Sequence, residues 1–151
     1  MKKNVLFILI AIFVSSCNSN DDNLQMLNVT SSLIAKGNLY GNGAEEIIEQ
    51  NLEITDQKTW SDLITKMNSV NNTSDSFSEI DIDFSQYKII AIFDEIRTNG
   101  GHGLELNIRS NAENMIVRKI ETVSEGNTTT VIAQPFLIVK ISNTTLPIIF
   151  E

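Results

Sequence analysis

The sequence predicts an α+β domain in which one principal helix accompanies a mostly antiparallel sheet of five or six strands. Two observations support this prediction. One segment in the first half of the chain has the apolar spacing of an amphipathic helix. From Tyr87 onward, apolar or alternating segments of strand length follow one another, and short polar turns separate them.

The first sixteen residues, MKKNVLFILIAIFVSS, have the layout of a signal peptide. Two lysines precede an apolar run from Val5 to Val14, and two small serines follow it. A membrane-spanning helix needs about twenty apolar residues, and this run is much shorter. We therefore expect residues 1–16 to direct export and then to be removed.

Cys17, the only cysteine of the chain, directly follows this segment. The sequence VSSC resembles the bacterial lipobox, although that motif more often has Leu where Val14 stands and Gly or Ala where Ser16 stands. The resemblance implies cleavage before Cys17 and acylation of its thiol and of the new amino terminus. Two or more acyl chains anchor stably, because each buried methylene contributes roughly 0.8 kcal/mol. The alternative is an ordinary secretory signal that leaves Cys17 as a free thiol, since an intrachain disulfide is excluded.

Two acidic residues, Asp21 and Asp22, stand shortly after Cys17. They resemble the export signal that sends some lipoproteins of Bacteroidetes-type bacteria to the cell surface. The alternative is a solvated linker with no signalling role. The predicted location is the bacterial cell envelope, as an outer membrane lipoprotein, with exposure on the cell surface left open.

Three regions are predicted: a signal peptide at 1–16, a tether at 17–37 and a domain at 38–151. Cleavage would leave 151 − 16 = 135 residues, a normal size for one domain with its own core. Loss of two lysines would change the net charge from −8 to −10. Such an acidic chain repels phosphate backbones, so nucleic acid is not an expected partner. The tether composition favours a flexible chain, but apolar residues between 24 and 35 leave a short strand open.

Residues 54–70, ITDQKTWSDLITKMNSV, predict the helix. Thr55 or Asp56 can accept hydrogen bonds from its first amides. Its apolar side chains form one stripe, so we expect the only tryptophan to lie in the core; the stripe consists of Trp60, Leu63, Ile64 and Met67. The polar residues 71–81 that follow are expected to form a loop that does not pack.

Strands are predicted on both sides of this helix. Turn signals at Gly41 and Gly43 precede a strand predicted over residues 47–54. Residues 87–93, YKIIAIF, are apolar on both faces, as in a central strand covered on each side. Residues 104–109, LELNIR, alternate as in a strand with one wet face.

Three further segments continue the series: IVRKIETV, VIAQPFLIVKI and LPIIF. The last two contain Pro135 and Pro147, which cannot donate a hydrogen bond to a neighbouring strand. Each proline is therefore expected at the start of a strand or in an edge strand.

His102, the only histidine, is the one obvious candidate for a catalytic base. Asp94, Glu95 and Glu105 are the nearest acids in sequence that could assist it. One histidine and one cysteine cannot form the usual metal clusters, so we predict no cofactor and no catalytic site. A weak calcium site made by carboxylates stays open, without the spacing of an EF-hand.

The glycines around His102 favour a structural interpretation. Gly100, Gly101 and Gly103 permit positive φ angles in a connection between two strands. We therefore predict a hairpin-like loop in which His102 is exposed.

The order of these segments resembles the domain of the protease complex subunit PrcB family. The likeness covers roughly residues 38–151 and includes the stretch DFSQYKIIAIFDEIRTNGGHGLELNI. Five residues fit the family's Thr-Gly-Gly-Tyr-like turn and late Gln-Pro: Thr98, Gly100, Gly101, Gln134 and Pro135. Asn99 and His102 depart from the pattern, and the family often has Gly near Asp94. The resemblance implies a noncatalytic lipoprotein that associates with a surface protease or stabilises it.

A glycine-rich loop between strands can present backbone amides and a distinctive side chain to a partner. The predicted partner-binding edge consists of Arg97, Thr98, Asn99, Gly100, Gly101 and His102. The simpler alternative is a hairpin that only needs glycine. Two further alternatives are binding of a small ligand and inhibition of a protease, the latter from a faint likeness to the Thr-Gly-Tyr wedge of chagasin-like inhibitors. A hydrolase would require polar groups that converge on His102.

Overall fold

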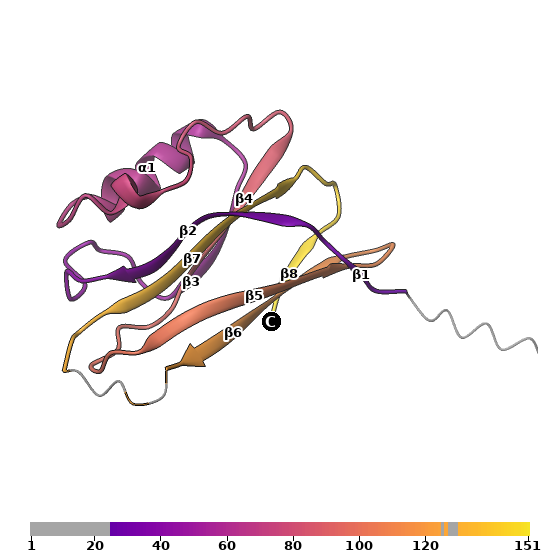
Figure 1. Ribbon diagram of the computed structural model, residues 1–151. Helices are drawn as coiled ribbons and strands as arrows, with labels where there is room; N and C mark the ends of the chain where they lie inside the picture. The colour runs from indigo at the N-terminus through magenta and orange to yellow at the C-terminus, as the bar shows by residue number, and fades with distance from the viewer. Residues whose placement is uncertain (1–24, 125, 127–129) are drawn as a thin grey trace, which may run out of the picture.

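Strand pairing in the computed structural model, which describes residues 25–124, 126 and 130–151, sorts the strands into two sheets (Figure 1). The helix-side sheet has the order β2-β7-β4-β3 and consists of Ser31–Leu39, Gln134–Ser142, Tyr87–Phe93 and Gln50–Ile54. The outer sheet has the order β1-β5-β6-β8 and consists of Leu27–Asn28, His102–Ser110, Met115–Val123 and Ile148–Phe150. All pairs are antiparallel except β6 with β8.

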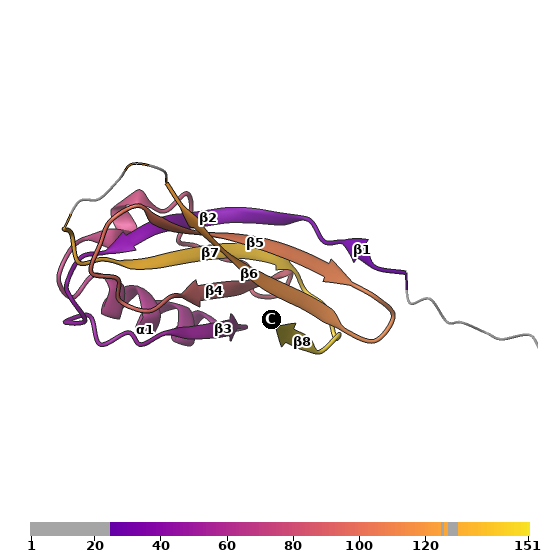
Figure 2. The same cartoon turned by 90° about the horizontal axis from the view of Figure 1, so that it is seen from below.

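The mostly antiparallel α+β class with one principal helix is therefore confirmed, but the single sheet of five or six strands is wrong. The strands form two sheets of four strands each. In Figures 1 and 2, the helix α1, the helix-side sheet and the outer sheet form three successive layers.

The helix α1 spans Gln57–Met67 and begins as its sequence predicts. The Asp56 side chain caps it by accepting a hydrogen bond of 2.9 Å from the Thr59 amide. Trp60 is fully buried, and Leu63 and Met67 lie in the same core against the helix-side sheet. The predicted apolar stripe and the core position of Trp60 are confirmed.

Strand β4 explains why the fold needs a second sheet. Ile89, Ala91 and Phe93 pack in the core that includes α1, whereas Ile90 and Ile92 pack in the core between the sheets. Alternating residues of a strand face opposite sides, so both faces of β4 must be covered. The prediction of a central strand covered on each side is confirmed.

The remaining strands form where the sequence predicts them, but two begin later than predicted: β3 begins at Gln50 instead of residue 47, and β7 begins at Gln134 instead of Val131. In β5, Leu104 and Ile108 are buried while Glu105 and Arg109 are exposed, which is the expected alternation. Pro135 is the second residue of β7, and Pro147 directly precedes the edge strand β8. Neither proline interrupts the middle of a strand.

The expected division between tether and domain, at residue 38, falls inside strand β2. Residues 31–39 pair with β7, and Ile34 and Leu39 are only 2% exposed. The sequence left open whether this region is a flexible tether or contains a short strand. In the structure it contains two strands: β1 lies in the outer sheet and β2 in the helix-side sheet. The described tether residues from 27 onward are therefore part of the sheets.

The polar segment 71–81 does pack, contrary to expectation. It contains a short 3₁₀ helix, η1, at Thr73–Ser76. The ring of Phe77 stacks on Trp60 at a centroid distance of 5.9 Å, and the Ile80 carbonyl accepts a 2.8 Å hydrogen bond from the indole nitrogen. These two contacts, with hydrogen bonds that Thr73, Ser74 and Ser78 make to neighbouring segments, hold a segment whose average composition is polar.

Candidate partner-binding site

The segment 94–101 carries the chain from β4 in the helix-side sheet to β5 in the outer sheet. The two strands do not pair with each other, so the hairpin interpretation of this loop is wrong. At its ends, the Asp94 amide donates to the Pro135 carbonyl at 2.9 Å, and the Ser124 amide donates to the Gly101 carbonyl at 2.9 Å. The connection is therefore held against a neighbouring segment at both ends.

The glycines of this region serve different purposes. Gly101 has a φ of +89°, a conformation that disfavours other residues, and Gly100 and Gly103 do not have a positive φ. Gly103 pairs with Thr122 across β5 and β6, where an added Cβ would lie 2.9 Å from the Thr122 hydroxyl oxygen. The prediction of positive φ is thus confirmed for Gly101 and wrong for the other two.

Arg97 is bound by its own chain. Its guanidinium lies 2.7 Å from Asp94, 2.8 Å from Glu95 and 3.0 Å from Glu121. Its backbone forms an isolated bridge with Ala133, through hydrogen bonds of 2.8 and 3.0 Å. Arg97 therefore fixes the base of the loop instead of presenting a free charge.

Asp94 is the centre of this charged cluster and is only 2% exposed. Lys119 on β6 lies 2.9 Å from its second carboxylate oxygen. Burial raises the pKa of Asp94, but hydrogen bonds from Lys119 and Arg97 outweigh burial and hold this pKa below its ordinary value of 3.8. The same contacts raise the pKa of Arg97 and, against the opposite effect of burial, that of Lys119.

The charged cluster joins the two sheets, because Asp94 follows β4 and both Lys119 and Glu121 belong to β6. Sequence reasoning missed it. One signal was present: Met115 and Val117 face the core, and the same face of β6 continues with Lys119 and Glu121. The partner residue, however, lies 25 positions away from Lys119 and follows a different strand.

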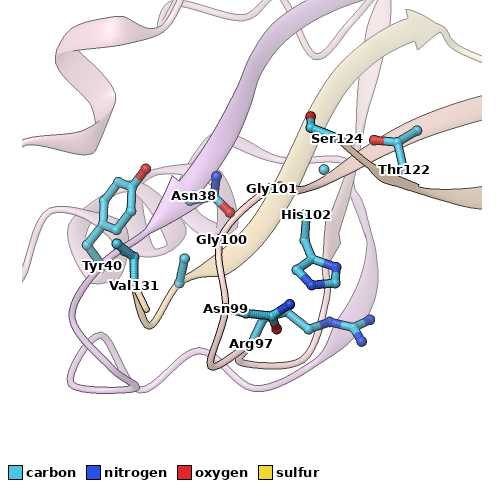
Figure 3. A pocket seen from close by; sticks show the side chains of 12 residues that line it. Asn38, Tyr40, Arg97, Asn99, Gly100, Gly101, His102, Thr122, Ser124 and Val131 are labelled. Atoms are coloured by element: carbon cyan, nitrogen blue, oxygen red, sulfur yellow. The ribbon is translucent and has the colours of Figure 1, made fainter. Parts of the chain in front are cut away.

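A cleft of about 300 Å³ lies beside the loop. Figure 3 shows Tyr40 and Val131 on one side of it and Thr122 and Ser124 on the other, with the 97–102 segment between them. The segment contributes Arg97, Asn99, Gly100, Gly101 and His102 to the lining. Thr98, which does not line the cleft, is exposed, as is Asn99.

His102 is the first residue of β5 and is half-buried, so the expectation of an exposed histidine is wrong. Its Nε2 is buried and has no hydrogen-bond partner among the described residues. Within that same part of the chain, the structure brings no carboxylate of Asp94, Glu95 or Glu105 within hydrogen-bonding distance of the ring. The geometry therefore provides no acid that would orient His102 as a base.

Across residues 25–124, 126 and 130–151, no three His, Cys, Asp or Glu side chains are grouped so that they could hold a metal ion. No helix in the described part of the chain combines the length and apolar character needed to cross a membrane. Cys17 and the expected signal peptide lie outside the described residues. Lipidation of Cys17 therefore stays a prediction from sequence.

Comparison of the chain with family models, with curated proteins and with solved structures found no match. The resemblance to the PrcB family thus rests on the sequence motifs alone and remains a hypothesis.

Proposed function

We propose that this chain is a membrane-anchored, noncatalytic lipoprotein that binds a protein partner through the 97–102 segment. The partner we propose is an extracytoplasmic protease, whose complex at the cell surface the lipoprotein stabilises. The anchor is the acylated Cys17, and the resemblance to the PrcB family motivates the class of partner.

The observation that carries this proposal is a loop with a fixed base and an exposed tip. Arg97 is paired with Ala133 through its backbone and with three carboxylates through its side chain. Gly101 is held by the Ser124 amide, whereas Thr98 and Asn99 between these two points are exposed. A preorganised loop loses little conformational entropy when it binds, so more of the contact energy appears as affinity.

Apolar side chains near the tip provide further contact area. Tyr40 is 59% exposed and Val131 is 41% exposed, and both line the same cleft. Tyrosine combines a large apolar ring with a polar hydroxyl and is enriched among residues that dominate binding energy. Polar loop groups beside such side chains suit recognition of a protein surface.

The point where the described chain enters the outer sheet also favours this site. Strand β1 enters the outer sheet beside Ser110, the last residue of β5, whereas His102 is the first residue of the same strand. Figures 1 and 2 show β1 and the start of β5 at opposite ends of the sheet. At about 3.3 Å per residue, β5 separates these ends by roughly 26 Å. The site therefore lies at the end of the sheet remote from the point where the chain leaves toward Cys17.

Affinity capture from native membranes tests the proposal. The acylated full chain is compared with a double variant, Thr98→Ala and Asn99→Ala, because both side chains are exposed and their loss leaves the core intact. We expect the wild type to enrich a protease and the variant to lose it. Equal enrichment of the protease by both proteins would move the contact elsewhere, and no enriched protease would contradict the proposed partner class.

A small polar ligand is the second candidate, and the cleft itself favours it. Its volume of about 300 Å³ lies at the lower end of small-molecule sites, and Asn38, Asn99, Thr122 and Ser124 supply polar groups. The third candidate is a protease inhibitor, and an activity assay of the captured protease tests it. If the wild-type chain inhibits the protease and the Thr98→Ala, Asn99→Ala variant does not, the chain is an inhibitor.

A further inference from the structure

A second recess is lined in part by Glu95 and Ile96 and shares no lining residue with the cleft. This acidic groove has a volume of about 520 Å³. Its apolar lining comes from Ile47, Ile48 and Ile96, and its carboxylates are Glu46, Glu49 and Glu95. It touches the proposed partner-binding edge only through the ion pair between Glu95 and Arg97.

The apolar part of the groove is exposed. Ile48 is 75% exposed and Ile96 is 41% exposed, although both are large aliphatic side chains. Ile96 lies against the turn at Gly43, where an added Cβ would be 3.1 Å from its Cδ1. Two aliphatic side chains that line one groove and remain open to water favour a site that a ligand covers.

The negative charge around the groove indicates that its ligand is cationic. Glu49 contacts Lys119 at 3.3 Å and Glu95 contacts Arg97 at 2.8 Å, while Glu46 has no ion pair among the described residues. With Asp94 and Glu121, five acids thus accompany two bases in this region, a balance of 2 − 5 = −3. Such a field attracts cations and repels anionic lipid and nucleic acid.

Gln134, buried between the walls of the groove, provides an independent observation. It is 3% exposed, and its side-chain nitrogen donates to the carbonyls of Ile47 at 3.0 Å and Asp94 at 2.9 Å. Its side-chain oxygen has no partner in the described part of the chain. An unsatisfied buried acceptor destabilises a fold, and a hydrogen-bond donor from a ligand would offset that cost.

We propose that the acidic groove binds a cationic peptide segment of a protein partner, one with an aliphatic side chain flanked by Lys or Arg. The aliphatic side chain packs on Ile48 and Ile96. The flanking cations approach Glu46 and the other carboxylates of the rim, and a peptide N–H donates to the Gln134 oxygen. Charge complementarity and apolar contact act together, so neither alone is sufficient.

Fluorescence polarisation with three labelled peptides tests this proposal on the acylated full chain in detergent. The probe is Gly-Lys-Leu-Lys-Gly, and the controls are Gly-Glu-Leu-Glu-Gly and Gly-Lys-Gly-Lys-Gly. We expect the probe to bind at least ten-fold more tightly than either control, and its affinity to fall as salt rises. Equal affinity for all three peptides, or no binding of the probe, would overturn the proposal.

Ile48→Ser supplies the matched protein variant, because the side chain is mostly exposed and its loss spares the core. We expect a loss of at least ten-fold in affinity for the probe. Val70→Ser, at an exposed aliphatic side chain outside the groove, should leave binding unchanged. If Ile48→Ser binds normally, the peptide does not occupy the groove. If light scattering instead finds a dimer that Ile48→Ser dissociates, a second copy covers the groove and the proposal is wrong. Because Thr98 and Asn99 are unchanged throughout, failure here leaves the proposed partner-binding edge untouched.

Discussion

At the scale of single residues, Asp94 joins the two sheets. Its carboxylate is buried and accepts hydrogen bonds from Arg97 and Lys119, and each of these cations also pairs with Glu121. We expect Asp94→Asn to lower the free energy of unfolding by about 1–3 kcal/mol, because it removes the buried carboxylate and leaves both cations with exposed partners only. Urea denaturation followed by tryptophan fluorescence measures this loss.

An exposed ion pair provides the control for Asp94. Asp62 pairs with Lys58 on the surface of α1, where the two side chains are 62% and 84% exposed. Water screens such a pair, so Asp62→Asn should have little effect on stability. Equal losses for the two variants would contradict a special role of the buried cluster.

The Asp94 carboxylate also makes stability depend on pH. Because its folded pKa lies below its unfolded pKa, its contribution is present above the unfolded value, near 4, and is lost as pH falls through the folded value. We expect the free energy of unfolding to decrease below about pH 5 and to decrease less in Asp94→Asn. Asp56 and Asp83 also have lowered pKa values, so the variant keeps some acid sensitivity. Identical acid profiles would contradict the assignment to Asp94.

The sequence alone predicted which residues form the loop, but not which of them are exposed and which hold the loop in place. Thr98 and Asn99 are exposed, as a binding edge requires, but Arg97 is bound to three carboxylates. Local sequence suggested Asp94 only as a neighbour of His102. The actual partner, Lys119, comes from the opposite sheet, and tertiary pairing of that kind leaves no local pattern.

At the scale of elements, Trp60 connects α1 to the segment that follows it. Trp60→Phe keeps an aromatic ring but leaves the Ile80 carbonyl without its donor. We expect a loss of about 0.5–1.5 kcal/mol in the free energy of unfolding, the usual net contribution of one hydrogen bond, because this bond is only partly buried. Since Trp60 is the only tryptophan, circular dichroism should follow the unfolding. An unchanged denaturation midpoint would show that segment 71–81 does not depend on this bond.

Strand β2 begins at Ser31, before the predicted domain boundary at residue 38. A chain that begins at Gln25 keeps β2, whereas a chain that begins at Asn38 loses most of it, including the buried side chains of Ile34 and Ala35. Burial of one large aliphatic side chain contributes about 1.5–3 kcal/mol, and a whole domain is stable by only about 5–15 kcal/mol. We expect the longer chain to unfold cooperatively in circular dichroism and the shorter chain to be unfolded. Cooperative unfolding of the shorter chain would restore residue 38 as the boundary.

The helix and the strands were predictable because each carries its own periodicity. The apolar stripe of residues 60–67 indicates which face of α1 is buried, and the apolar residues on both faces of β4 indicate that both are buried. The second sheet was not predicted, because a strand that is apolar on both faces does not say whether a helix or a sheet covers it. The single helix α1 can cover only one face of β4. The other apolar face therefore needs a second sheet, and the outer sheet covers it.

At the scale of the whole molecule, strand β1 and the 97–102 segment lie at opposite ends of β5. Leu27, the first residue of β1, lies ten positions after Cys17, and an extended chain of ten steps spans at most about 35 Å. If Cys17 is acylated as we propose, the domain is held closer to the membrane than a tether through residue 37 would allow. The 97–102 segment would then lie at the end of β5 remote from the membrane, as the proposed binding of an extracytoplasmic partner requires.

The most direct measurement for the central claim is photo-crosslinking from the tip of the loop in living cells. A photoreactive phenylalanine analogue replaces Asn99 in the full chain, and the same analogue at exposed Thr145, beyond the opposite end of β7, is the control. The account predicts a protease adduct from position 99 and none from position 145. Absence of a protein adduct at position 99, or the same adduct from both positions, would contradict the claim that this end of the domain binds the partner.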